Sequence, residues 1–154
     1  MNAGQIVAIV MTSGAVAGPL GDGVAAYDRG DYATALRLWR PLAEQGDANA
    51  QFDLGGLYEK GEGVPKDYVE AAKWLRLAAE QGNFVYEFNL GLTYYDGKGV
   101  PQDCVLAHMW FNLAATQGYD LAIQMRDSVA AKMTADQIAE AQRMAREWKP
   151  TTQP

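Results

Sequence analysis

The stretch AQFDLGGLYEKGEGVPKDYVEAAKWLRLAAEQG, from Ala50 to Gly82, contains the pattern on which most of the chain is built. Much of this stretch returns 36 residues later in altered form. The recurring positions are Leu54-Gly55, Tyr58, Gly61, Gly63 and Val64-Pro65, which come back as Leu90-Gly91, Tyr94, Gly97, Gly99 and Val100-Pro101. A fixed period of this length indicates stacked supersecondary units, none of which buries its apolar face alone.

The amino-acid composition limits the classes of protein to which this chain can belong. The chain has 154 residues, of which 49% are hydrophobic, and this is enough apolar side chain for one domain with a continuous core. The formal net charge of -6 leaves no basic stripe for nucleic acid or for an anionic membrane surface. A single cysteine excludes an internal disulfide framework and a multi-cysteine metal site.

The first 20 residues differ in kind, because none of them carries a charge. The apolar run from Ile6 to Met11 is followed by small residues that suit a cleavage site after Ala17, although no Lys or Arg precedes the run. We therefore expect residues 1–17 to be an export signal, which would make the protein periplasmic or secreted. The alternative is a poorly ordered apolar N-terminus on a cytoplasmic protein. The run is too short to span a bilayer stably.

Helix signals surround the first copy of the pattern. The segment Val24–Arg29 predicts a short helix, and Asp31 is a suitable N-cap for a second helix to about Gln45. The connection between them is shorter than in later copies, as expected for the first, capping unit of a stack. Pro41 removes a hydrogen bond inside the second helix, so we expect a kink near Leu38.

The second and third copies each predict two antiparallel helices. The expected helices are Ala48–Lys60 with Tyr68–Gln81, and Phe84–Tyr95 with Asp103–Thr116. Gly61 offers a left-handed C-cap, Pro65 cannot continue a helix, and Asp67 with Glu70 resembles a capping box. Apolar residues at helical spacing predict the buried positions, which are Ala71, Trp74, Leu75 and Ala78, and then Ala107, Trp110, Phe111 and Ala114.

The last part of the chain departs from the pattern. Arg126 and Ala130 replace the expected Leu and Tyr, so a helix over Tyr119–Lys132 belongs to a degenerate copy. Thr134 begins a capping box for a final helix to about Trp148. The predicted organisation is therefore a segment 1–17, a repeat domain 18–148 with copies at 24–46, 47–82, 83–118 and 119–148, and a disordered tail 149–154.

These residues resemble a known family. The pattern of Ala50, Leu54-Gly55, Tyr58, Gly61-x-Gly63-Val64-Pro65, Asp67, Ala71, Trp74 and Ala78-Ala79-x-x-Gly82 is similar to the Sel-1-like repeat (SLR), a relative of the tetratricopeptide repeat. The resemblance implies an all-α fold, a right-handed α/α superhelix (solenoid) of about four antiparallel helix pairs. It also implies a concave surface that binds proteins or peptides. Bacterial members are often exported, and family members commonly act as adaptor scaffolds.

Two groups of residues invite a chemical interpretation. The Gly-Glu-Gly and Gly-Lys-Gly loops follow helices in register with the period, which favours helix caps over phosphate cradles. Cys104 and His108 lie four residues apart on one predicted helix, so a thiolate–imidazole pair is conceivable. However, both occupy packing positions of the repeat, which favours a partly buried Cys and His.

The opposite face of the first helix in each copy predicts a binding surface. At 100° per residue, Phe52 and Phe88 lie away from the Leu54 and Leu90 stripe, on the face that is concave in the resembled repeats. The candidate partner-binding residues are Asn49, Phe52, Gly56, Glu59, Val85, Phe88, Leu92, Tyr95, Gln124 and Ser128. The alternative is that both rings only pack between repeats. Tyr86 stands where the second copy has Ala50, so it either opens the stack or projects into the groove.

The sequence thus predicts a non-catalytic scaffold that binds a protein or peptide partner, with no cofactor, metal, nucleic acid or stable membrane insertion. One alternative is a hydrolase or thiol enzyme that uses Cys104 and His108. Another is a structural repeat protein that self-associates through its groove.

Overall fold

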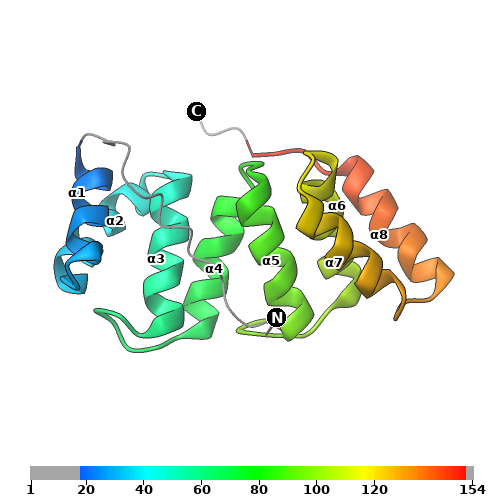
Figure 1. Ribbon diagram of the computed structural model, residues 1–154, viewed down its shortest axis with the longest axis horizontal. Coiled ribbons are helices and arrows are strands. Elements are labelled where there is room, and N and C mark those ends of the chain that lie inside the picture. Colours follow the sequence, from blue (N-terminus) through cyan, green and yellow to red (C-terminus); the bar gives the residue numbers. More distant parts are fainter. Residues whose placement is uncertain (1–17, 152–154) are drawn as a thin grey trace. The chain divides into compact units, whose positions relative to one another are not determined.

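The computed structural model describes residues 18–151, and the secondary structure elements within them are all helices (Figure 1). The predicted signal segment 1–17 lies outside the described residues. The helices are α1 (Pro19–Asp28), α2 (Tyr32–Glu44), α3 (Ala48–Lys60), α4 (Tyr68–Ala79), α5 (Phe84–Asp96), α6 (Cys104–Thr116), α7 (Asp120–Ala130) and α8 (Ala135–Glu147). The predicted all-α class is therefore confirmed for this part of the chain.

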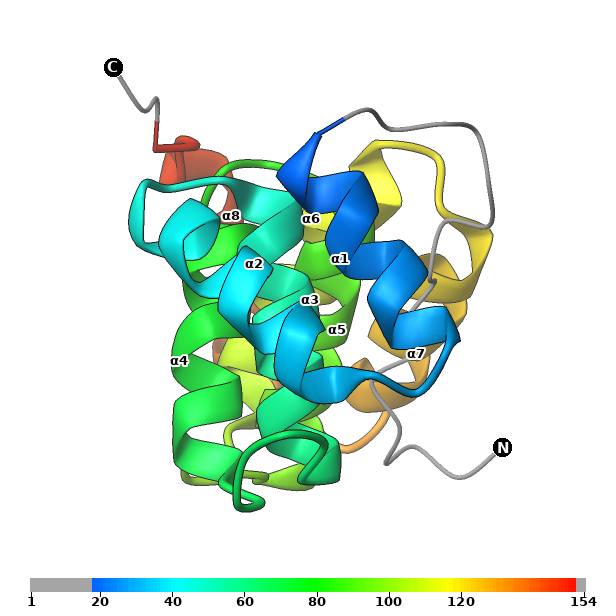
Figure 2. The ribbon, with the colours of Figure 1, turned by 90° about the vertical axis from the view of Figure 1, so that its left-hand side faces the viewer.

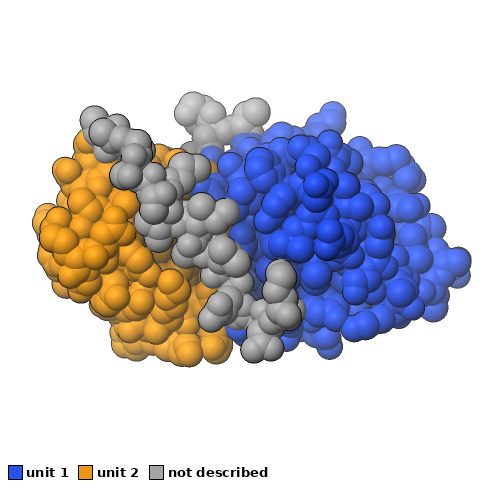
Figure 3. Space-filling model, viewed as in Figure 1, with its two compact units in different colours: residues 1–6, 79–154 blue, residues 7–78 orange. Residues whose placement is uncertain are grey.

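The described residues form two compact units, 18–78 and 79–151 (Figure 3). We call residues 18–78 the first unit, which is orange and labelled unit 2 in Figure 3, and residues 79–151 the second unit, which is blue and labelled unit 1 there. The first unit contains α1 to α4 except for the last residue of α4, and the second contains α5 to α8.

Short polar side chains start most of these helices, as the sequence predicts. Asp31 accepts a hydrogen bond from the Thr34 amide, and Asp103 accepts one from the Leu106 amide. Thr134 and Gln137 form a reciprocal capping box at the start of α8. Each such bond satisfies an amide that the first helical turn leaves without a partner.

Trp39 organises the core of the first unit, in which α2 packs against both α1 and α3; Figure 2 shows α1 and α2 in the foreground. Its indole donates a hydrogen bond to the Leu20 carbonyl at 3.2 Å, and its ring contacts Tyr27. Gly23 lies so close to this indole that any Cβ there would collide with it. A glycine inside α1 is therefore a packing requirement.

Helix α1 is longer than the sequence predicts, and α2 continues through a proline. The first helix was predicted to begin at Val24, but it begins at Pro19, a residue that suits the first helical position because it needs no amide partner. The second helix continues through Pro41 to Glu44. The kink near Leu38 stays a prediction.

The core of the second unit is built around α6, which packs against α5, α7 and α8. All four α6 residues predicted to be buried are buried, with Phe111 fully so. Trp110 meets the ring of Trp148 edge-on, with centroids 5.6 Å apart. Ala141 and Ala145 bury the inner face of α8. Tyr86 is also buried, so its side chain does not project into an open groove.

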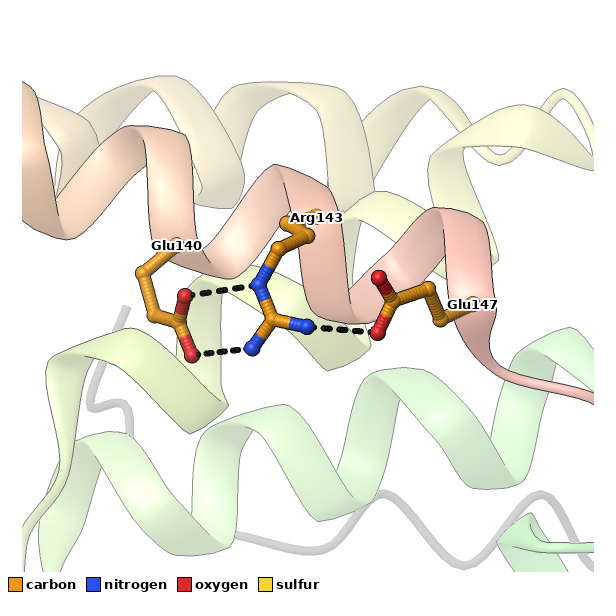
Figure 4. A network of polar contacts seen from close by, with 3 residues as sticks. All are labelled: Glu140, Arg143 and Glu147. Carbon is orange, nitrogen blue, oxygen red and sulfur yellow. Dashed lines mark hydrogen bonds and ion pairs between the residues drawn. The ribbon is translucent and has the colours of Figure 1, made fainter.

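The outer face of α8 carries an exposed ionic network (Figure 4). Arg143 donates two hydrogen bonds to Glu140 and one to Glu147. Such solvent-exposed pairs contribute little to stability. The segment after α8 differs from the expected disordered tail, because the Thr151 amide donates to the Glu80 carbonyl at 2.7 Å. Residues 149–151 are thus tied to the turn before α5.

Candidate partner-binding surface

The two aromatic residues at the centre of the predicted surface are buried. Phe52 on α3 and Phe88 on α5 are each 4% exposed. The Phe88 ring packs against Phe111 at 5.5 Å and against Tyr119 at 5.0 Å, centroid to centroid. The prediction that these rings are open anchors is wrong for this structure, since both are buried. The packing alternative describes them better.

The other predicted surface residues divide by exposure. Gly56, Glu59 and Leu92 are buried, whereas Val85 and Tyr95 are partly exposed. The exposed members are Asn49, Gln124 and Ser128. Asn49 belongs to the first unit, and the accessible members of the second unit lie on α5 and α7. Their role in binding stays a prediction.

Contacts at both ends fix α5 and α7 relative to each other. At the start of α7, the Tyr119 ring meets Phe84 and Phe88 of α5, with centroids 5.3 and 5.0 Å apart. At the other end, the Lys132 ammonium donates to the Tyr95 hydroxyl at 2.6 Å and lies 5.0 Å from the centre of its ring. This hydrogen bond raises the pKa of Lys132. The accessible residues of α5 and α7 are therefore held on a fixed frame.

Sequence reasoning missed this tyrosine–lysine contact, which occurs twice. In the first unit, the Lys60 ammonium donates to the Tyr27 hydroxyl at 2.9 Å. Lys60 and Lys132 are two repeat periods apart, so the sequence alone shows that they occupy equivalent positions. Tyr27 and Tyr95 are not a whole number of repeat periods apart, because the loop that follows Tyr27 is shorter than the corresponding loops in later repeats.

The Cys104 and His108 pair gains no support from the geometry. His108 is 3% exposed, and its Nδ1 atom has no hydrogen-bond partner within the described part of the chain. Burial, together with the positive charge of Arg126, lowers the pKa of His108. Cys104 is a partly buried free thiol, and no hydrogen bond joins it to His108 among residues 18–151. The two residues fit the packing interpretation.

The glycine loops are helix caps, as predicted. Gly61 and Gly97 take left-handed backbone angles, with φ of 69° and 68°, and their amides donate back into α3 and α5. Only glycine takes this conformation without strain.

Two carboxyl groups, the buried Glu87 and the partly buried Asp53, are the main electrostatic anomalies. Burial raises the pKa of Glu87 to about 7. Burial, reinforced by the nearby Asp47 charge, likewise raises the pKa of Asp53 to about 7. Neither residue was singled out from the sequence, and the only signal was that each interrupts an otherwise apolar or small-residue stretch.

Two further properties concern residues 18–151 as a whole. No cluster of three or more His, Cys, Asp or Glu side chains there is arranged to hold a metal ion. No helix in the same range combines the length and apolar character that crossing a bilayer requires.

Comparison with known proteins identifies the repeats. The sequence matches the Sel1 repeat model over residues 20–47, 48–83 and 86–119. Among solved structures, c5321, a protective antigen present in uropathogenic Escherichia coli strains and displaying an SLR fold, is similar with a TM-score of 0.79 and 34% identity. A Sel1 repeat protein from Oxalobacter formigenes is similar with a TM-score of 0.67 and 29% identity.

These similarities extend over most of this chain but over only part of the other proteins. They cover 84% and 87% of this chain, and 29% and 55% of the E. coli and O. formigenes chains respectively. No match was found among curated proteins. Since the family model covers more than half of the residues, the chain belongs to the Sel1 repeat family.

Proposed function

We propose that this protein is a non-catalytic binding module that holds a partner protein or peptide on the accessible residues of α5 and α7. Sel1 repeats generally serve as scaffolds for protein–protein interaction, and three of them make up most of this chain. Membership of this family is the observation that carries the proposal.

The structure of the second unit supports the choice of surface. Phe88, Phe111 and Tyr119 form an aromatic cluster behind the surface, and the Tyr95–Lys132 bond ties the far ends of α5 and α7. A surface that is already rigid orders little on binding, so less of the interaction free energy is spent on conformational entropy. The buried rings thus act as a support for the binding residues rather than as anchors for the partner.

Gln124 and Ser128 give the sharpest test. They are exposed and lie four residues apart, on one side of α7. We expect the full-length protein to capture a partner from an extract of the source cells, and the double variant Gln124→Arg/Ser128→Arg to retain at least tenfold less of it. Two arginines add bulk and charge to the surface without entering the core.

A matched variant controls for added charge. Ala139→Arg/Gln142→Arg places the same two side chains on exposed positions of α8 and should capture the partner as the unmodified protein does. Far-ultraviolet circular dichroism must show equal helicity for all three proteins. Equal capture by both variants would reject the proposed surface and direct attention to the loops or to the first unit.

A further inference from the structure

The carboxyl group of Glu87 is buried and has too few hydrogen-bond donors around it to stabilise a negative charge. The residue is 1% exposed on α5, and its Oε2 atom accepts one hydrogen bond, from Gln117 Nε2 at 2.8 Å. Its Oε1 atom is buried and has no hydrogen-bond partner in the part of the chain that the structure describes. An ionised carboxylate in such a place lacks the solvation it has in water, so the neutral acid is favoured.

The equivalent residue of the preceding repeat indicates which hydrogen bond the Oε1 atom of Glu87 can make. Gln51 stands one period before Glu87, and its Nε2 atom donates to the Ala43 carbonyl at 3.1 Å. That carbonyl also accepts from the Gly46 amide at 3.0 Å. A neutral carboxyl has the shape of a carboxamide and presents an O–H where the amide presents an N–H.

The same acceptor exists one period later. The Ala79 carbonyl, at the end of α4, accepts from the Gly82 amide at 3.0 Å, just as the Ala43 carbonyl accepts from Gly46. The turn that contains Ala79 and Gly82 also receives the C-terminal segment, through the bond from the Thr151 amide to the Glu80 carbonyl.

We propose that the Glu87 carboxyl is a pH-sensitive latch: its neutral form donates a hydrogen bond to the Ala79 carbonyl, and loss of the proton releases the turn between α4 and α5. The proton leaves to solvent. Among residues 18–151, only the Gln117 side chain then donates a hydrogen bond to the resulting carboxylate. This inference is independent of the proposed partner.

The surrounding ionisable groups do not offset the effect. Those on neighbouring segments are Glu80 and Lys149 beside the turn, Asp96 on α5, Cys104 and His108 on α6, and Asp120, Arg126 and Asp127 on α7. Burial is the cause of the raised pKa of Glu87, and no charge from these groups adds to it or opposes it. The latch therefore responds to the proton on Glu87 alone.

The sign of the pH effect follows from the raised pKa. The latch contributes its full stability below the ordinary glutamate pKa and loses it as the pH rises through about 7. We expect the folding equilibrium constant to fall by roughly 10–100-fold between pH 5 and pH 8 because of this residue. Glu87→Gln fixes the latch in a neutral, hydrogen-bonding form and should abolish this fall.

The experiment is urea unfolding of the full chain at pH 5 and pH 8, with carbon-13 NMR of the Glu87 carboxyl. Because Asp53 also has a raised pKa, the comparison is made between Asp53→Asn and Asp53→Asn/Glu87→Gln. We expect only the former to lose stability at pH 8, with hydrogen exchange increasing in residues 79–83. The carboxyl carbon should titrate near pH 7.

The reciprocal variant Gln51→Glu is the matched control. It should install a second latch against the Ala43 carbonyl and make the first unit less stable at pH 8 than at pH 5. A Glu87 carboxyl that titrates between pH 4 and pH 5 would overturn the proposal. So would a Glu87→Gln variant that is less stable than its parent at pH 8, or one that keeps the parent's pH dependence.

Discussion

Helices α3 and α5 occupy the same place in successive repeats, yet they are built on different interiors. Each begins after a side chain that caps its first turn, Asp47 or Asn83, and each ends at a left-handed glycine, Gly61 or Gly97. The backbone plan is thus repeated almost without change. The residues that recur at the repeat period are therefore those that set the local backbone conformation, such as helix caps.

The buried side chains of the two helices do not repeat in this way. Tyr86 replaces an alanine, Glu87 replaces Gln51, and Asn89 replaces Asp53. The partner helix differs as well, because Phe111 of α6 stands where α4 has Leu75. The interior of each unit is therefore packed with different side chains. Substitutions at equivalent positions should change the free energy of unfolding by different amounts.

The largest expected difference concerns the two residues at the centre of the paired helices. Phe111 is fully buried and contacts the Phe88 ring, whereas Leu75 is a smaller buried side chain. We expect Phe111→Ala to lower the free energy of unfolding by about 3–5 kcal/mol, and Leu75→Ala to cost less, near the lower end of about 2–5 kcal/mol. Urea unfolding followed by circular dichroism measures both.

Hydrogen exchange with mass spectrometry shows where each change acts. Protection should fall in residues 79–151 for Phe111→Ala and in residues 18–78 for Leu75→Ala, because stability in repeat proteins is largely local. An equal loss of protection in both units would show that the two interiors unfold as one core. It would contradict the prediction that each substitution acts only in its own unit.

A smaller difference is expected at the glycines that let paired helices approach. A Cβ on Gly91 would lie 2.6 Å from the Phe111 ring, whereas the nearest atom to a Cβ on Gly55 is the Ala71 carbonyl oxygen at 3.2 Å. We expect Gly91→Ala to cost about 1–3 kcal/mol through overpacking, despite the better helix propensity of alanine. Gly55→Ala should cost about 1 kcal/mol or less, since propensity offsets part of a milder clash.

A second substitution separates the two causes. Phe111→Leu should recover at least half of the Gly91→Ala loss, because the obstructing group is a side chain. Leu75→Ala should not rescue Gly55→Ala, because the obstructing group there is backbone. If neither pair shows coupling in a double-mutant cycle, the helix approach does not depend on these contacts.

Much of the fold could be predicted because its signals are local and periodic. The predicted helix Ala48–Lys60 has the bounds seen in the structure, and the N-cap at Asp31 and the capping box at Thr134 were recognised from residue type and position. The start of α1 was missed, since Gly21 and Gly23 look like helix breakers. The tertiary contact with the Trp39 indole explains why α1 contains Gly23.

The candidate surface was harder to predict because exposure depends on neighbours that a helical wheel does not include. The angle between Phe88 and Leu90 correctly separates two faces of α5, but Phe111 and Tyr119 cover the Phe88 face. The Tyr95–Lys132 contact was missed for the same reason, since it joins residues 37 positions apart. Both contacts are set by how α6 and α7 pack on α5, and no local pattern encodes that packing.

The smallest expected difference concerns Asp53 and its counterpart Asn89. Burial and the Asp47 charge raise the pKa of Asp53 to about 7, so this residue stabilises the fold below pH 4 and loses that contribution as the pH rises through 7. Asp53→Asn should therefore make the protein more stable at pH 8 and remove part of the slope between pH 4 and pH 8. Because Asp53 is only partly buried, water screens the carboxylate, and we expect a gain of about 1–2 kcal/mol.

The Glu87→Gln background isolates this effect from the second raised pKa. The reverse change, Asn89→Asp, places a charge at a position where the amide oxygen is fully buried and unpartnered within residues 18–151, so it should cost more at pH 8 than Asp53→Asn gains there. Urea midpoints at pH 4, 6 and 8 measure both. An Asp53→Asn variant with an unchanged pH slope would mean that the Asp53 carboxylate is hydrated in solution, and that Asp53 and Asn89 do not differ in the environment that their repeats provide.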